Sequence, residues 1–148
     1  MNNYIFFTLP ANIRQGCNLD FQIVISSKVE NFRQLLWKIV SLGRMKRYCV
    51  MDGSNVIATA DVMPKIFIFS FMRGGVHIGP CFTLDGYRNR GVYTNLLKKI
   101  CNDYLNCEKY IFCSVDNIAS KRGILKAGFS SIGLGYKTKI GIYKLHTV

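Results

Sequence analysis

The sequence has few of the residues that bind metals or build disulfide frameworks. It contains two histidines, and its six cysteines form no Cys-x-x-Cys pair. Structural zinc sites need closely spaced cysteine and histidine ligands, so no metal site is expected. The cysteines lie mostly within apolar segments. Buried free thiols are therefore favoured over disulfides, which indicates a reducing compartment such as the cytoplasm.

The chain also lacks long apolar runs and linkers. Its longest apolar candidate, residues 65–72, has the length of a strand, whereas a membrane-spanning helix needs about 20 residues. No basic segment precedes a long apolar stretch near the first residue, so a secretory signal is not expected. No Pro/Gly/Ser-rich tract or repeat divides the sequence. Residues 1–148 are therefore expected to form one domain.

Acidic residues are scarce, with eight against 20 lysines and arginines, which gives a net charge of +12. The excess is spread along the sequence, because residues 1–74 hold nine basic and four acidic residues and residues 75–148 hold eleven and four. A basic surface suits nucleic acid or anionic small molecules, and it also suits an ordinary soluble surface. The aromatic residues fall mostly in apolar strand patterns, which makes nucleic acid the less favoured partner.

Hydrophobic periodicity predicts an α+β (mixed α/β) domain with a mostly antiparallel sheet. A helix with its apolar residues on one stripe is expected over residues 29–42, and a turn is expected over residues 52–55. The stripe consists of Phe32, Leu35, Leu36, Ile39 and Val40. Strands are expected over 3–9, 21–25, 47–51, 56–61, 65–71, 76–83, 109–115, 130–136 and 140–145, and two more helices over 91–104 and from 116 or 117 to 128.

The most informative segment is residues 75–97. It reads as a buried strand, a short turn and the start of an amphipathic helix. The turn contains Arg88, Arg90 and Gly91. A helix N-terminus after a glycine-containing loop offers free N–H groups and the positive end of the helix dipole. This arrangement binds phosphate, so the segment predicts a phosphorylated cofactor or nucleotide.

The order of elements around this turn resembles the GNAT superfamily of acyl-CoA-dependent N-acetyltransferases. The order is strand, Arg-x-x-Gly turn, helix, strand, Asn-x-x-Ser helix, Gly-Phe and strand, and the resemblance covers residues 45–147 well and the earlier ones only by topology. Arg88 and Gly91 match the family's turn, Arg/Gln-x-x-Gly-x-Gly/Ala, while Tyr93 replaces its last small residue. Residues 77–93 are similar to a subgroup associated with sugar and polysaccharide biosynthesis. The resemblance implies a mixed, mostly antiparallel sheet with helices on both faces.

The resemblance also implies acetyl-CoA as the co-substrate. The pyrophosphate would lie on backbone amides of Arg88, Asn89, Arg90, Gly91, Val92, Tyr93 and Thr94. The pantetheine arm would bind the main chain of Cys81, Phe82 and Thr83, where the strand splays from its neighbour. Pro80 favours such a break because it has no N–H to donate. Asn117 and Ser120 would line the cofactor channel, although Asn117 has the alternative role of a helix cap only.

Several residues are candidates for the chemistry. His77 is the candidate base, because its ordinary pKa near ~6.5 suits proton transfer and it lies on the cofactor strand; its alternative is a structural histidine. In many relatives a tyrosine protonates the leaving thiolate, and Ile124 stands at that position. The acid is therefore missing or supplied elsewhere. Tyr87, Tyr93 and Tyr136 are equal candidates to supply a proton or to stack on a substrate. Cys81 suggests an acyl-enzyme, but no base is evidently paired with it.

The function expected from the sequence is direct transfer of acetyl from acetyl-CoA to an amino (or hydroxyl) group. The acceptor is expected to be small, an amino sugar or a nucleotide sugar, and the protein cytoplasmic, with a homodimer possible. Two alternatives stay open. One is a basic nucleic-acid-binding protein, and the other is a GNAT domain that binds CoA without turnover.

Overall fold

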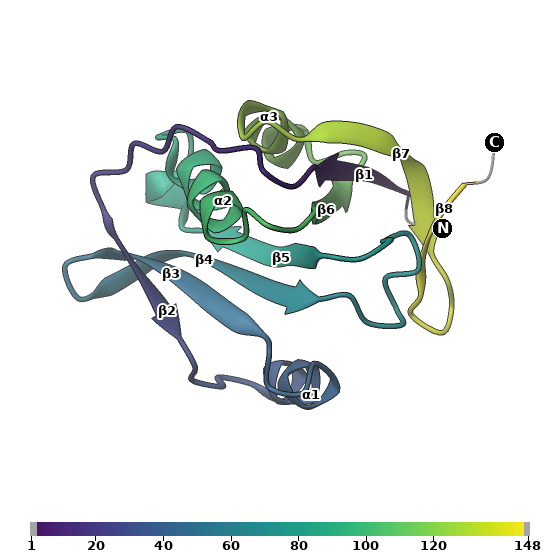
Figure 1. Cartoon of the computed structure of the whole chain (residues 1–148). Helices are drawn as coiled ribbons and strands as arrows, with labels where there is room; N and C mark the ends of the chain where they lie inside the picture. Colours follow the sequence, from purple (N-terminus) through teal and green to yellow (C-terminus); the bar gives the residue numbers. More distant parts are fainter. Residues whose placement is uncertain (1–2, 147–148) are drawn as a thin grey trace.

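The computed structural model describes residues 3–146, and these form one mixed sheet with three α-helices (Figure 1). The strand order is β2-β3-β4-β5-β6-β1-β7-β8, and every neighbouring pair is antiparallel except β5 and β6. The elements are β1 (Asn3–Leu9), β2 (Gln22–Ser26), α1 (Phe32–Val40), β3 (Lys46–Asp52), β4 (Asn55–Pro64), β5 (Val76–Thr83), the 3-10 turn η1 (Asp85–Tyr87), α2 (Val92–Asp103), β6 (Lys109–Ser114), α3 (Ile118–Lys126), β7 (Ser130–Lys137) and β8 (Tyr143–Leu145). The predicted mixed, mostly antiparallel architecture is confirmed. Among residues 3–146, no helix has the length and apolarity to cross a membrane.

Strand β1 lies between two strands from the far end of the sequence (Figure 1). Tyr4 is opposite Ser114 of β6 on one side and Gly135 of β7 on the other. The chain leaving β1 is held by Lys109, a fully buried side chain whose Nζ donates to the Pro10 carbonyl at 3.0 Å. Strand β1 therefore lies in the sheet between two strands, β6 and β7, that come from the second half of the chain.

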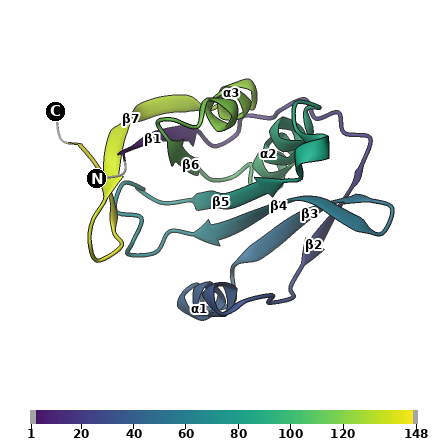
Figure 2. The same ribbon diagram turned by 180° about the vertical axis from the view of Figure 1, so that it is seen from behind.

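Each face of the sheet carries its own hydrophobic cluster, and the alternation of side chains along β4 separates them. Val62 packs into the larger cluster, which contains the inner faces of α2 and α3, whereas the next residue, Met63, packs into the smaller one. The smaller cluster includes Trp37 of α1 and the connection that follows β4. Figure 2 shows α2 and α3 together on one side of the sheet, with α1 apart from them. Helices thus lie on both faces, as predicted.

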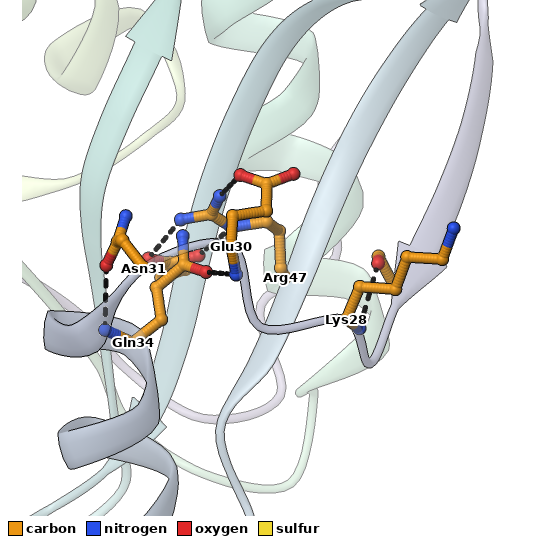
Figure 3. A network of polar contacts seen from close by, with 7 residues as sticks. Lys28, Glu30, Asn31, Gln34 and Arg47 are labelled. Atoms are coloured by element: carbon orange, nitrogen blue, oxygen red, sulfur yellow. Dashed lines mark hydrogen bonds and ion pairs between the residues drawn. The ribbon is translucent and has the colours of Figure 1, made fainter.

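Helix α1 forms close to its predicted place, and its apolar stripe is mostly exposed. Phe32, Leu35, Leu36 and Ile39 are exposed, and the buried residue of the helix is Gln34. Two local contacts form at the start of the helix. The Asn31 side chain caps the helix by accepting from the Gln34 N–H, and the Gln34 side chain in turn accepts from the Glu30 N–H (Figure 3). Helix α1 therefore turns the side that carries Gln34 and Trp37 inward.

An ion-pair network connects this helix start to the sheet. Arg47 of β3 makes a two-pronged contact with Asp61 of β4, with Nε–Oδ1 at 2.7 Å and Nη2–Oδ2 at 2.9 Å. Its remaining Nη1 donates to Glu30 at 2.6 Å, just before α1 (Figure 3). The Arg47 and Asp61 side chains are almost fully buried, whereas Glu30 is mostly exposed. The carboxylate partners, and hydrogen bonding to Asp61 above all, raise the pKa of Arg47.

Residues 65–71 were expected to form a strand, and that prediction is wrong. The segment is a connection with turns, and its one ladder contact is an isolated bridge between Phe69 and Tyr143. Its apolar side chains nevertheless contribute to the core, because Ile68, Phe69 and Met72 are buried in the smaller cluster. The apolar run therefore packs as a covering loop and contributes no strand.

Candidate functional site

The site begins where two parallel strands separate. Strands β5 and β6 pair only at Val76–Lys109 and His77–Tyr110, and beyond these pairs they diverge. Strand β5 keeps its pairing to β4 on the other side as far as Thr83. The backbone edge of β5 that faces β6 is therefore left without a strand partner after His77. An amide-bearing ligand can bind such an edge through main-chain hydrogen bonds.

A groove of about 880 Å³ runs from this open edge across the turn before α2 and the start of α3. Three basic side chains line it, Arg88, Arg122 and Lys126, and no acidic residue is among those of residues 3–146 that line it. Low-dielectric walls of one charge sign raise the local concentration of an oppositely charged ligand. The groove is therefore suited to a polyanion. Its lining includes Cys81, Phe82, Thr83, Tyr87, Asn89, Gly91, Val92, Tyr93, Thr94, Asn95, Asn117, Ile118, Ala119, Ser120 and Gly123.

The turn before α2 has the backbone shape of an anion-binding loop. Asn89 and Gly91 adopt left-handed conformations, with φ of 59° and 76°. Gly91 is the N-cap of α2, and no side chain accepts from the first-turn N–H groups there. In α1 and α3, by contrast, Asn31 and Asn117 cap the first turn with their side chains. The first-turn N–H groups of α2 are therefore available to a ligand in the groove.

A second cavity, which we call the chamber, continues from the groove. It encloses about 350 Å³ between the diverging strands. Four residues line both the groove and the chamber: Cys81, Tyr93, Asn117 and Ser120. A ligand that extends along the groove would place its end at these four side chains.

The junction contains one hydroxyl suited to donate a proton. The Tyr93 hydroxyl and the Ser120 Oγ are 3.2 Å apart. Burial, above all, raises the pKa of Tyr93 well beyond its usual value, so the phenol stays protonated. Burial also raises the pKa of the Cys81 thiol to about 12. The junction thus presents a protonated phenol and a protonated thiol, and no thiolate nucleophile.

The chamber has several aromatic walls and cations at two positions. Tyr4, Trp37, Phe69, Phe112 and Tyr143 contribute rings, and Arg33 and Lys137 contribute the charges. Lys137 Nζ lies 5.3 Å from the ring centre of Tyr143, within the range of a cation–π contact. Flat or apolar groups can stack on these walls while an anionic group meets the cations.

His77 lies in the chamber wall, but its surroundings do not favour the predicted role of base. Its ring is sandwiched between Phe69 and Phe112, with ring centres 4.2 and 5.0 Å away. Burial lowers the pKa of His77 to about 3, and neither ring nitrogen has a hydrogen-bond partner among residues 3–146. A neutral imidazole with so low a pKa is a weak base at neutral pH. The structural alternative is therefore the better description of His77.

The predicted cofactor residues gather at the groove with one exception. Arg90 does not line it; its guanidinium lies over the rings of Tyr87 and Phe21, at 5.2 and 6.0 Å from their centres. Arg88 does line the groove, and its Nε donates to the Thr83 carbonyl at 3.2 Å. Asn117 has both of the roles weighed for it, because it caps α3 through the Ser120 N–H and lines the groove.

Two basic groove residues and one amide were missed by the sequence reasoning. Arg122 and Lys126 lie four positions apart in α3, so they share a helix face, and this spacing was a readable signal. Asn95 was harder to find. Its amide donates to the Gly91 carbonyl at 3.1 Å and accepts from the Asn18 N–H at 3.1 Å, which ties a distant loop to the turn.

Comparison with solved structures gives relatives by shape. A protein from Novosphingobium aromaticivorans assigned to the GNAT family of acetyltransferases superposes with a TM-score of 0.63 at 15% identity, over 90% of this chain and 61% of its own. A protein of unknown function from Staphylococcus epidermidis gives 0.62 at 10% identity, over 90% and 59%. A GNAT-family acetyltransferase from Colwellia psychrerythraea gives 0.51 at 14% identity, over 89% and 53%. The chain thus spans about three fifths or less of the length of these structures.

No protein-family model matches the sequence, and a search of curated proteins finds no match. The likeness is therefore one of architecture, carried by the eight-stranded sheet and its three helices. This protein has a GNAT-like fold.

Proposed function

We propose that the protein is an acetyl-CoA-dependent acetyltransferase that transfers acetyl directly to an amino (or hydroxyl) group of a small acceptor. The observation that carries the proposal is the continuity of two cavities. A basic groove over the uncapped N-terminus of α2 leads to an aromatic chamber at the point where β5 leaves β6. A long cofactor with a polyanionic end and a reactive end needs such a passage.

Successive parts of the groove would bind successive parts of acetyl-CoA, from the phosphates to the pantetheine arm. The first-turn N–H groups of α2 would receive the pyrophosphate, and Arg88, Arg122 and Lys126 would balance the phosphate charges. The free edge of β5 from Cys81 to Thr83 would bind the amides of the pantetheine arm. Bound acetyl-CoA supplies the acetyl group as a reactive thioester.

Tyr93 is the residue we assign to proton donation. When a new bond forms between the acceptor nitrogen and the acetyl carbon, the bond from carbon to sulfur breaks and the thiolate needs a proton. The nitrogen loses one proton to solvent, and solvent returns one to the donor after each turnover. The Tyr93 phenol lies at the junction of groove and chamber, and its raised pKa keeps it protonated. Ser120 holds its hydroxyl in place. This would supply the acid that the sequence lacks at Ile124, which is buried in the core.

The acceptor is proposed to be an amino sugar or a sugar nucleotide. Two features support this class. Aromatic walls such as Trp37 and Tyr143 can stack on a sugar or base, and Arg33 and Lys137 can meet a phosphate. A basic acceptor such as a polyamine is disfavoured, because no carboxylate lines the chamber among the described residues.

The first experiment measures thermal stabilisation by acetyl-CoA and release of thiol with a panel of amino sugars and their nucleotides. Stabilisation with turnover is expected. Stabilisation without turnover across the panel would favour a CoA-binding domain, and no stabilisation would refute the groove assignment. Binding of nucleic acid in place of acetyl-CoA would favour the alternative function.

Gly91→Val tests the turn itself, because a side chain at this left-handed residue would obstruct the approach of phosphate to the backbone. Gly43→Val is the matched control. Gly43 has nearly the same φ, 74° against 76°, and lies away from the groove. Both variants carry similar backbone strain, but only Gly91→Val should weaken acetyl-CoA binding. Equal affinities in the two variants would contradict the assignment.

A further inference from the structure

The positive charge of this protein is concentrated in space, although it is spread along the sequence. Three segments, residues 27–46, 65–72 and 137–144, contain nine of the 20 basic residues and one of the eight acidic residues. The acidic residue, Glu30, is already engaged by Arg47. All three segments contribute to the wall of the chamber, through Arg33 and Trp37, Phe69, and Lys137 and Tyr143 respectively. We call these three segments together the basic rim.

The basic rim also carries the most exposed large apolar side chains of the described residues. Phe32 and Leu42 beside α1 are 79% and 81% exposed, Phe67 after β4 is 73% exposed, and Ile140 in the β7–β8 turn is 80% exposed. Figure 1 shows α1, the connection after β4 and the β7–β8 turn on the side of the molecule away from α2 and α3. Large apolar side chains exposed beside cations mark a surface that binds a partner.

Helix α1 shows that this exposure is built into the fold. Gln34 is buried, and Glu30 just before the helix is bound by Arg47 of β3 (Figure 3). Phe32, Leu35, Leu36 and Ile39 are exposed on the helix. An apolar face flanked by lysine and arginine is the pattern of a helix that lies in the plane of a membrane interface.

The positive charge of the basic rim favours some partners over others. If two copies of the chain met through this surface, nine basic residues of one copy would face nine of the other, and their repulsion would oppose the contact. Nucleic acid would neutralise the cations, and its bases would stack on aromatic rings and accept hydrogen bonds. It offers no apolar partner for Leu42, Ile39 or Ile140. An anionic lipid surface satisfies both, because lysines and arginines meet the headgroups while aliphatic side chains enter the acyl region.

We infer that the basic rim docks the protein onto an anionic membrane surface, with Phe32, Leu42, Phe67 and Ile140 inserting beneath the headgroups. Each lysine or arginine near such a surface contributes about 1 kcal/mol, or roughly fivefold in partition coefficient. The docking holds the chamber, whose wall includes all three segments, beside the lipid. It requires neither bound acetyl-CoA nor turnover.

The test is co-sedimentation of the full chain with phosphatidylcholine vesicles, with and without phosphatidylserine. Binding is expected with phosphatidylserine, and it should fall as salt is added. Lys46→Gln with Lys139→Gln should lower the partition coefficient about 25-fold, at roughly fivefold each. Phe32→Ser with Ile140→Ser should also lower it. The matched controls are Lys98→Gln with Lys121→Gln and Val56→Ser, which lie outside the basic rim and should bind as the parent chain does.

A second measurement reports insertion directly. Tryptophan fluorescence of Ile140→Trp should be quenched by brominated lipid, whereas Val56→Trp should show only the response of the parent chain's Trp37. Three results would overturn the inference: no binding to phosphatidylserine vesicles at low salt, equal loss in the control variants, or a dimer in solution that Phe32→Ser dissolves without vesicle binding. Preference for single-stranded DNA over vesicles, unaffected by Phe32→Ser with Ile140→Ser, would assign the face to nucleic acid instead.

Discussion

Arg47 binds two carboxylates whose different burial predicts very different energies. Asp61 is about as buried as a side chain can be, with 2% of it exposed, whereas 62% of Glu30 is exposed. Removing one partner of a buried ion pair costs about 3–5 kcal/mol, because the other charge stays buried. An exposed pair contributes at most about 1 kcal/mol. Asp61→Asn should therefore destabilise the fold by about 3–5 kcal/mol, and Glu30→Gln by about 1 kcal/mol or less.

Urea denaturation followed by circular dichroism measures both variants. With a slope of about 1–3 kcal/mol per molar urea, Asp61→Asn should lower the midpoint by about 1 M or more. Glu30→Gln is the matched control, since it removes a contact to the same guanidinium with an atom separation of 2.6 Å, against 2.7 Å for Asp61. Similar losses in the two variants would show that distance, and not burial, sets the energy. That result would refute the reasoning.

Three further predictions concern the chamber and the junction. The pKa of His77 falls from 6.5 to about 3 on folding, so the unfolded chain binds the extra proton and stability is lost as the pH falls below about 6.5, at about 1.4 kcal/mol per pH unit. His77→Phe should remove most of this loss between about pH 6.5 and 5, as measured by urea denaturation at each pH; an unchanged slope would contradict the burial argument. Tyr93→Phe should lower kcat by about 100-fold or more while acetyl-CoA affinity stays within about twofold, and a normal kcat would exclude Tyr93 as the acid. Cys81→Ala should keep kcat within a few-fold, because a thiol with a pKa of about 12 is no nucleophile at neutral pH; trapping of an acetyl-cysteine in the parent chain would contradict direct transfer.

Sequence patterns predicted best where the signal is local. Helix α2 follows a left-handed Gly91 and repeats apolar residues at helical spacing, so both its start and its buried side were readable. Helix α1 shows the limit of the same method. Its periodicity gave the helix and its apolar side, but burial depends on what packs against it. The distant contact of Glu30 with Arg47, and the packing of Trp37 against the smaller cluster, are tertiary contacts that periodicity does not contain.

The residues of the candidate site also fall into those that local sequence signals predict and those that they do not. The turn residues and Asn117 could be placed, because loops, caps and helix starts carry their own sequence signals. The state of His77 could not. Its low pKa depends on Phe69 and Phe112, which come from a connection and from another strand, and no spacing along the chain indicates that sandwich. Tertiary contacts of this kind decide the chemistry of a side chain.

The position of β1 has a consequence for how this protein is made. Thr8 of β1 donates its hydroxyl proton to the carbonyl of Lys109, 101 positions later, and β7 comes later still. A ribosome adds about 5–20 residues per second, so the first strand waits several seconds before its partners leave the exit tunnel. During that time Phe6 and Phe7, which point to opposite faces of the strand, have no native cover. The nascent chain is therefore an expected client of chaperones that bind short apolar segments.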